Sequence, residues 1–370
     1  MTNDQSLMTK DQSPAPNDRR VRGRAGPEAH GMPLRYWSSV PGPWSLALGH
    51  WSFVLGHWFF LGAAFLWALG ASSAFAQFQE GGDPKGPKLG EAQVQRWQFG
   101  LLVQTPSGPA RDMIGYVPLP SEWPEQQLAV VGEEVSPGVH TGYETVDGTV
   151  KVMIVKIPQL AAGSEAKAMV TYEIRRHALL PPDKTDIYVL PDPKKLPKTV
   201  RPYLMASPMI EVKNPKVKAA LKEVKGDFPS AWKRVEAIYE YVRGRVEFRK
   251  GAVRGAVAAL RDGAGGEEDL TSLFIALCRT ADIPARTVWV PSHCYPEFYL
   301  EDDEGKGHWF PCEMTASRSF GGIAEHRPVI EKGDNFHPPY ARRDRQRFLS
   351  EYFTGVGQAK PRFYRVPAAE

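Results

Sequence analysis

The hydrophobic pattern of this 370-residue chain changes near residue 200, and this change most constrains how the chain can fold. From about residue 90, short runs of β-branched and aromatic residues alternate with turn residues. Asp147-Gly148, between alternating neighbours, is a strong hairpin signal. The pattern is typical of an antiparallel β-sandwich, which we predict over residues 90–200. Because this region contains no acid pair, metal cluster or glycine-rich phosphate loop, we expect the sandwich to have a packing or substrate-presenting role. The runs cover residues 97–103, 113–117, 128–131, 150–157 and 168–174.

Beyond residue 200 the apolar residues take helical spacing. Asn214-Pro215 and Ser230 are helix starts with capping side chains, and each precedes an amphipathic segment. A glycine-rich break then leads to three acids, Glu267 to Asp269, which open a helix with Cys278 on its apolar face. Two strands follow, at residues 287–300 and 308–315. We therefore predict an α+β domain over residues 201–325, and a tail at 326–370 that wraps the surface.

The first 76 residues differ from both domains. Residues 1–43 are rich in Pro, Gly, Ser and Arg without apolar periodicity, so we expect this extension to be disordered. Residues 44–76 carry no Lys, Arg, Asp or Glu and end in Ala74-Phe75-Ala76, the small-residue pattern that signal peptidase cleaves. We expect export to a periplasmic or extracellular location. The alternative is a retained membrane anchor, because this stretch is longer than a usual signal sequence.

The charge of the chain points to no polyanionic partner. The formal net charge is +4, and arginines of the N-terminal extension supply much of it. We therefore expect no nucleic-acid partner. The three cysteines are too few for a disulfide scaffold.

Three segments, in this order, resemble the conserved motifs of transglutaminase-like domains, which are related to papain-like cysteine peptidases. They are residues 265–286 (GGEEDLTSLFIALCRTADIPAR), 293–299 (HCYPEFY) and 309–315 (WFPCEMT). The family places a Gly-x-Cys turn before a helix that ends in Ile-Pro-Ala-Arg, then a His-Ala-Trp strand and a Trp-x-Pro-x-Asp strand. The resemblance implies an α+β papain-like fold over about residues 230–320.

The same resemblance implies a Cys-His-Asp site, in which a thiolate at a helix N-terminus attacks a carbonyl. His293 falls at the position of the base, and Glu313 at that of the carboxylate that orients it. The nucleophile position holds Glu267, which satisfies the helix terminus electrostatically but cannot perform thiol acyl transfer. The expected protein is thus a pseudoenzyme that binds peptide or a peptide-linked polymer at the retained cleft. An active acyltransferase or peptidase is the first alternative.

The second alternative is a metal-dependent hydrolase, because two carboxylates and one histidine also form a divalent-metal set. Glu267, His293 and Glu313 would be the ligands, although spacing alone does not mark a metal site, and we assign no metal or cofactor. Other histidines could add ligands, but we expect them at the surface because each stands among polar or turn residues: His308, His326 and His337.

The remaining candidates lie on the two predicted strands. If His293 pairs with Glu313 in an antiparallel ladder, Cys294 pairs with Cys312 on the opposite face. These two cysteines form either a cross-strand disulfide or two buried thiols. Two aromatic residues are candidates for the cleft, Tyr295 and Trp309, and strand parity makes Trp309 the preferred wall. The alternative for both is an ordinary core position.

Overall fold

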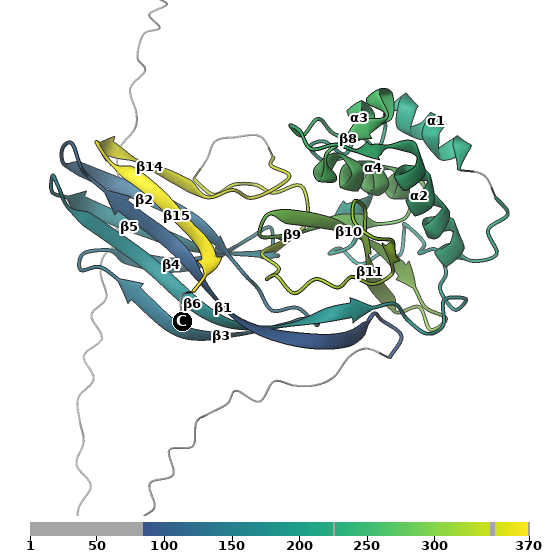
Figure 1. Cartoon of the computed structure of the whole chain (residues 1–370), viewed down its shortest axis with the longest axis horizontal. Helices are drawn as coiled ribbons and strands as arrows, with labels where there is room; N and C mark the ends of the chain where they lie inside the picture. The colour runs from purple at the N-terminus through teal and green to yellow at the C-terminus, as the bar shows by residue number, and fades with distance from the viewer. Residues whose placement is uncertain (1–83, 225, 341–344, 369–370) are drawn as a thin grey trace, which may run out of the picture. The chain divides into compact units, whose positions relative to one another are not determined.

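The computed structural model describes residues 84–224, 226–340 and 345–368 (Figure 1). The predicted N-terminal extension, 1–43, and the predicted signal sequence or anchor, 44–76, lie outside these residues. Among the described residues, no helix has both the length and the apolar character needed to cross a membrane.

Two four-stranded antiparallel sheets form the N-terminal part, as the sequence predicted. The first has the order β15-β1-β6-β3 and the second β14-β2-β5-β4. Their strands are β1 (Lys88–Gln104), β3 (Gln126–Val135), β6 (Glu165–Leu180) and β15 (Lys360–Pro367) in one sheet, and β2 (Ala110–Leu119), β4 (His140–Val146), β5 (Val150–Leu160) and β14 (Tyr352–Gly357) in the other.

The sandwich follows from the alternation in its strands. In β6, Ala168, Val170 and Tyr172 are buried and belong to one apolar cluster with Met153 and Val155 of β5. Successive side chains of a strand point to opposite faces, so one face of each sheet builds this core.

The turn between β4 and β5 confirms the predicted hairpin. Val146 pairs with Val150 around a three-residue loop, in which two residues have positive φ angles, 47° at Asp147 and 72° at Gly148. This is the conformation that Asp-Gly turns favour between antiparallel strands.

Residues 326–370, expected as a surface tail, contribute one strand to each sheet of the sandwich. β15 pairs with β1 along Trp97–Gln104, and β14 pairs with β2. Neither strand has a strong hydrophobic alternation, and β15 is largely exposed. The position of these strands therefore depends on β1 and β2, which lie far away in the sequence and whose outer edges would be unpaired without them.

The following α+β part has its helices on one face of a five-stranded antiparallel sheet (Figure 1). The sheet order is β12-β11-β10-β9-β13, and α4 packs directly on β9 and β10. The helices are α1 (Pro215–Glu223), α2 (Ala231–Arg245), α3 (Ala256–Asp262) and α4 (Glu267–Thr280), with a 3-10 turn, η1, at Arg201–Leu204. The strands of this sheet are β9 (Ala285–Val290), β10 (His293–Glu301), β11 (Gly307–Glu313), β12 (Ser319–Phe320) and β13 (Glu331–Lys332), and a separate parallel pair joins β7 (Glu247–Phe248) to β8 (Ala264–Gly265).

The predicted helix caps are present. Asn214 accepts a hydrogen bond from the Lys216 N–H, and Ser230 accepts one from the Lys233 N–H. At the start of α4, Asp269 reaches back to the Gly266 N–H, and its other oxygen accepts from the N–H groups of Arg254 and Gly255. One buried carboxylate thus ties the loop before α3 to the first turn of α4.

The sheet face opposite the helices packs against residues of the sandwich through buried charges. The Lys332 ammonium lies 2.7 Å from both Glu125 and Glu297, and Arg286 lies 2.8 Å from Glu297. Arg176 of β6, fully buried, donates to the hydroxyl of Tyr295 at 3.1 Å. Moving β10 away would leave these buried charges without their partners, which is strongly unfavourable. The network therefore favours the observed position of β10.

Candidate functional site

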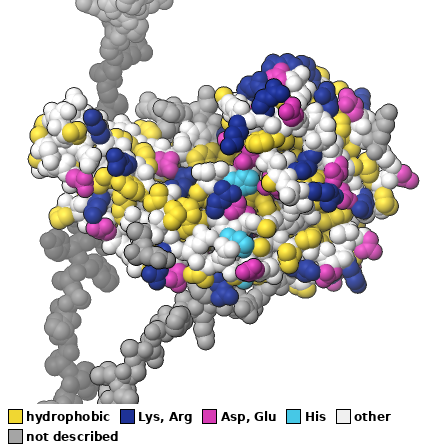
Figure 2. All heavy atoms as spheres, viewed as in Figure 1, with side chains coloured by type: hydrophobic (Ala, Val, Ile, Leu, Met, Phe, Trp, Pro, Cys, Tyr) yellow, Lys and Arg dark blue, Asp and Glu magenta, His cyan; other side chains and the backbone are white. Residues whose placement is uncertain are grey.

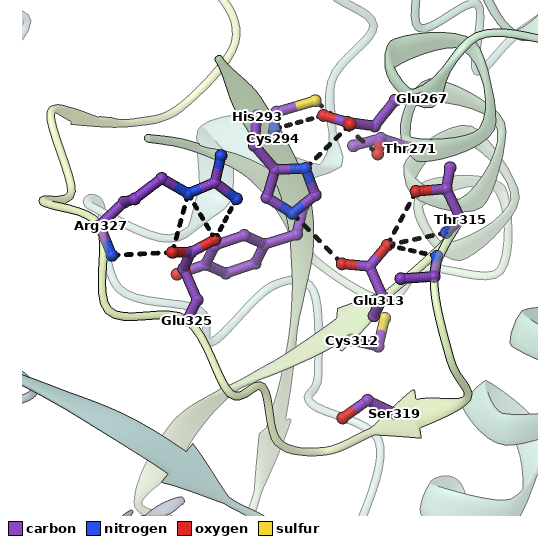
Figure 3. A network of polar contacts seen from close by, with 12 residues as sticks. Glu267, Thr271, His293, Cys294, Cys312, Glu313, Thr315, Ser319, Glu325 and Arg327 are labelled. Atoms are coloured by element: carbon purple, nitrogen blue, oxygen red, sulfur yellow. Dashed lines mark hydrogen bonds and ion pairs between the residues drawn. The ribbon is translucent and has the colours of Figure 1, made fainter. Parts of the chain in front are cut away.

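The three residues assigned from the motifs come together at one end of the sheet. Glu267 is the first residue of α4, His293 the first of β10 and Glu313 the last of β11. Figure 3 shows the imidazole ring of His293 between the two carboxylates. His293 Nδ1 lies 2.9 Å from Glu267 Oε2, and His293 Nε2 lies 3.2 Å from Glu313 Oε2.

Backbone donors hold both carboxylates. Glu267 Oε1 accepts a hydrogen bond from the Cys294 N–H at 2.5 Å. Glu313 Oε1 accepts from the N–H groups of Thr315 and Ala316 at 2.8 and 3.1 Å, and from the Thr315 hydroxyl. Each carboxylate therefore uses one oxygen for His293 and the other for the backbone.

This arrangement makes His293 a cation. Burial alone would lower the pKa of His293, but its hydrogen bonds to Glu267 and Glu313 outweigh burial and raise the pKa to about 9. Burial likewise raises the pKa of Glu313, but its hydrogen bonds from His293 and the Thr315 and Ala316 amides dominate and lower it to about 2. At neutral pH His293 is therefore an imidazolium, so the ring has no free lone pair for general-base catalysis.

Two further ion pairs flank the site. Glu325 and Arg327 form a bidentate pair beside His293, with the Arg327 N–H also donating to the Glu325 carboxylate (Figure 3). On the other side Glu268 pairs with Arg347, whose guanidinium also lies over the Trp289 ring at 5.0 Å. From the sequence, Glu268 was placed only in the first turn of a helix, and the other three residues received no role because they stand outside the three motifs.

The geometry does not suit a metal ion bound by all three motif residues. The two carboxylates approach opposite nitrogens of one imidazole, so the ring separates them. Among the described residues, no group of three or more His, Cys, Asp or Glu side chains is arranged to hold a metal.

The other histidines lie away from the site. His308, expected at the surface, is instead 4% exposed, and its Nε2 lies 2.8 Å from Asp302. It sits on the helix-facing side of β11, where Tyr188 and Phe310 cover it. His326 contacts the Glu91 carbonyl, and the exposed His337 contacts Asp147.

Of the two alternatives for Cys294 and Cys312, the structure shows two buried thiols and not a cross-strand disulfide. All three cysteines are free and buried. The β10–β11 register places Glu297 opposite Pro311 and Phe298 opposite Phe310, two residues away from the expected alignment, so Cys312 reaches the Pro296 carbonyl and Cys294 lies near Thr271. A shift of two residues preserves which face each side chain occupies, and for this reason His293 still meets Glu313.

A pocket of about 540 Å³ opens beside Glu267 and His293. Aromatic side chains form part of its lining, namely Phe248, Trp289 and Phe348, and Lys250 stands at its exposed lip. Figure 2 shows Lys and Arg side chains gathered near the end of the domain where Figure 1 places α3, with acidic residues among them.

The two predicted cleft aromatics do not line this pocket. Tyr295 is fully buried next to His293, with ring centroids 6.1 Å apart. Trp309 packs farther along the sheet against Arg286, 4.0 Å from its ring centroid, and against Tyr299. The aromatic wall is instead Trp289 of β9, which strand parity between β10 and β11 could not identify.

Comparisons with known proteins agree with the motifs. Residues 218–314 match the transglutaminase-like superfamily, and this range contains Glu267, His293 and Glu313. A comparison with curated proteins finds no match for this sequence.

Two solved structures are similar in arrangement. One is described as a candidate cysteine protease from Cytophaga hutchinsonii, with 18% identity, a TM-score of 0.48, and coverage of 76% of this chain and 94% of that one. The other is described as a candidate protease from Parabacteroides distasonis, with 15% identity and a TM-score of 0.24 over 67% of this chain and 48% of that one. With the three motifs converging on one site and the family match spanning them, residues 218–314 of this chain are a domain of the transglutaminase-like superfamily.

Proposed function

We propose that this protein is an exported transglutaminase-like protein without thiol catalysis, which binds a peptide or a peptide-linked polymer in the pocket beside Glu267. One observation carries the proposal: the Glu267 carboxylate is hydrogen-bonded to both His293 and the Cys294 amide, at the helix N-terminus where the family has its thiol. A carboxylate held in this way, next to an imidazolium, leaves neither a thiolate nor a free base.

The cysteines of the chain do not replace the missing nucleophile. Cys294 is 2% exposed, and Cys278 and Cys312 are fully buried. Burial raises the thiol pKa of all three well above the ordinary value. Reactive cysteines need a lowered pKa and access to substrate, and these three have neither.

The pocket has features that suit an extended peptide. Trp289, Phe348 and the 41% exposed Phe248 offer apolar contacts, and Lys250 offers a cation at the lip. Gly251 lines the same pocket, and a Cβ added there would meet nothing within 4 Å. The export part of the proposal rests on the uncharged stretch at 44–76 and the Ala-Phe-Ala that ends it.

Replacing Glu267 by Cys tests the loss of catalysis. Glu267→Cys places a thiol at the N-terminus of α4 beside His293, where both the helix dipole and the imidazolium favour the thiolate. We expect this variant, and not the wild type, to hydrolyse an amide substrate or incorporate an amine. Glu268→Cys is the matched control, because it puts a thiol on the same helical turn but toward Arg347.

The same assay separates the alternatives. Turnover by the wild type would refute the non-catalytic proposal, and its loss with a chelator would indicate a metal-dependent hydrolase. Turnover by the wild type that resists chelator but not a thiol reagent would indicate an acyltransferase or peptidase.

Binding is tested by filling the pocket. Gly251→Trp adds a large side chain where there is open space, and we expect it to abolish binding of labelled peptides selected from a random hexapeptide pool by the wild type. Gly244→Trp is the control, since a Cβ at this exposed position of α2 also meets nothing within 4 Å. Equal binding by both variants would place the peptide site elsewhere.

A further inference from the structure

The sandwich contains a second cleft, separate from the Glu267 site. It lies between β3 and β4, the end strands of the two sheets on the side opposite β14 and β15. Its volume is about 630 Å³, within the range of roughly 300–1,000 Å³ typical of small-molecule sites. Trp123, Tyr143 and Tyr172 contribute aromatic surface, and Leu128 and Val130 contribute apolar surface.

Two buried polar groups of this cleft lack partners. The Tyr172 hydroxyl and the Trp123 Nε1–H have no hydrogen-bond partner among the described residues, although both atoms are buried. Tyr172 is 2% exposed, and burial raises the pKa of its hydroxyl to about 12, so the hydroxyl stays protonated and available as a donor. Buried Tyr and Trp normally pair these groups, because leaving a buried donor unpaired is unfavourable.

The surroundings restrict what can satisfy these donors. A purely apolar ligand such as an acyl chain would leave both donors unpaired. A phosphate group would meet two carboxylates, Glu122 and Glu144, against one cation, Lys151. A neutral ligand with many hydroxyl oxygens avoids both conflicts. It can accept from the two donors, donate to the carboxylates at the rim, and place its apolar ring face on the aromatic side chains.

The geometry points to a carbohydrate-binding site between β3 and β4, sized for about two sugar rings. This inference is independent of the proposed function, because it uses no residue of the Glu267 pocket. Tyr143, 45% exposed, stands at the mouth, where its hydroxyl donates to Glu133 and the Lys151 ammonium lies over its ring. These contacts hold Tyr143 at the opening, and the buried Tyr172 hydroxyl is the donor that the proposed ligand would pair with.

The test measures binding of chitobiose, cellobiose and maltose to the wild-type protein by ligand-observed NMR and calorimetry. We expect at least one disaccharide to bind saturably. Tyr172→Phe removes only the unpaired hydroxyl, so its affinity should fall by roughly two- to tenfold, the value of one hydrogen bond. Its melting temperature should stay equal or rise, since the lost group had no partner. Trp123→Phe should weaken binding similarly.

Tyr364→Phe is the matched control, because Tyr364 lies on β15, at the opposite edge of the same sheet as β6. This variant should bind like the wild type. The inference is overturned if none of the three disaccharides binds at about 20 mM, or if Tyr172→Phe and Trp123→Phe bind as well as the control. Binding of octanoate or inorganic phosphate, weakened by the same two variants and without disaccharide binding, would also overturn it.

Discussion

We predict that His293 carries a positive charge at neutral pH. Its pKa rises from an ordinary 6.5 to about 9 because Glu267 and Glu313 hydrogen-bond to opposite ring nitrogens. A shift of this size corresponds to about 3 kcal/mol, reduced by solvent screening because the Glu267 side chain is 25% exposed. Since the folded-state pKa is raised, this stabilisation is complete below pH 6.5 and is lost as the pH rises through 9.

Glu313 limits the same stabilisation on the acid side. Its folded-state pKa is lowered from 4.5 to about 2, so its contribution is present above pH 4.5 and is lost as the pH falls through 2. The ion-paired triad should therefore contribute most to the free energy of unfolding between about pH 4.5 and 6.5.

NMR titration of the imidazole resonances tests this prediction, with His293→Gln used to assign the signal. We expect an apparent pKa near 9 in the wild type and a lower value in Glu267→Gln, which keeps the shape of residue 267 but loses its charge. Urea unfolding of the same two proteins should show that the free energy of unfolding falls more between pH 6 and pH 9 in the wild type than in Glu267→Gln. A wild-type His293 pKa at or below 7 would refute the reasoning.

Three further predictions concern stability and thiols. Arg279→Met should destabilise the fold by about 3–5 kcal/mol in urea unfolding, because it leaves the buried Asp334 without the Arg279 Nη2 group that donates to both of its oxygens; a change below about 1 kcal/mol would contradict the buried pairing. Asp269→Asn should cost about 2–3 kcal/mol in the same assay by weakening charge-assisted hydrogen bonds to three backbone amides, and an unaffected midpoint would count against this role. A thiol reagent should find all three cysteines slow to react in the folded protein and three free thiols after denaturation without reductant; a count of one would reveal a disulfide.

Local features of the sequence were sufficient for the element types and for selecting three residues that the structure brings together. Asn214 and Ser230 cap helices because a short polar side chain directly before a helix can accept a hydrogen bond from a free N–H group of its first turn. The Asp147-Gly148 hairpin formed for a comparable reason, since few residue pairs tolerate two positive φ angles. The motif order was enough to select Glu267, His293 and Glu313.

Features that depend on contacts between distant segments were not predictable in the same way. The register of β10 against β11 differs by two residues from the expected one, which separates Cys294 from Cys312. His308 is buried because Asp302, in the preceding turn, satisfies its ring. Trp289, rather than Trp309, borders the pocket, because β13 pairs with β9 and the Phe348 ring packs 5.1 Å from that of Trp289.

The sequence by itself determined an antiparallel sandwich and a helix that begins at Glu267 with three acidic residues in its first turn, because these depend on local periodicity and residue chemistry. Only the tertiary structure decided that His293 is clamped between two carboxylates, that the last strands complete both sheets, and that a buried ionic network holds β10. The physical reason is that strand register, burial and pKa are set by neighbours brought together from distant parts of the chain.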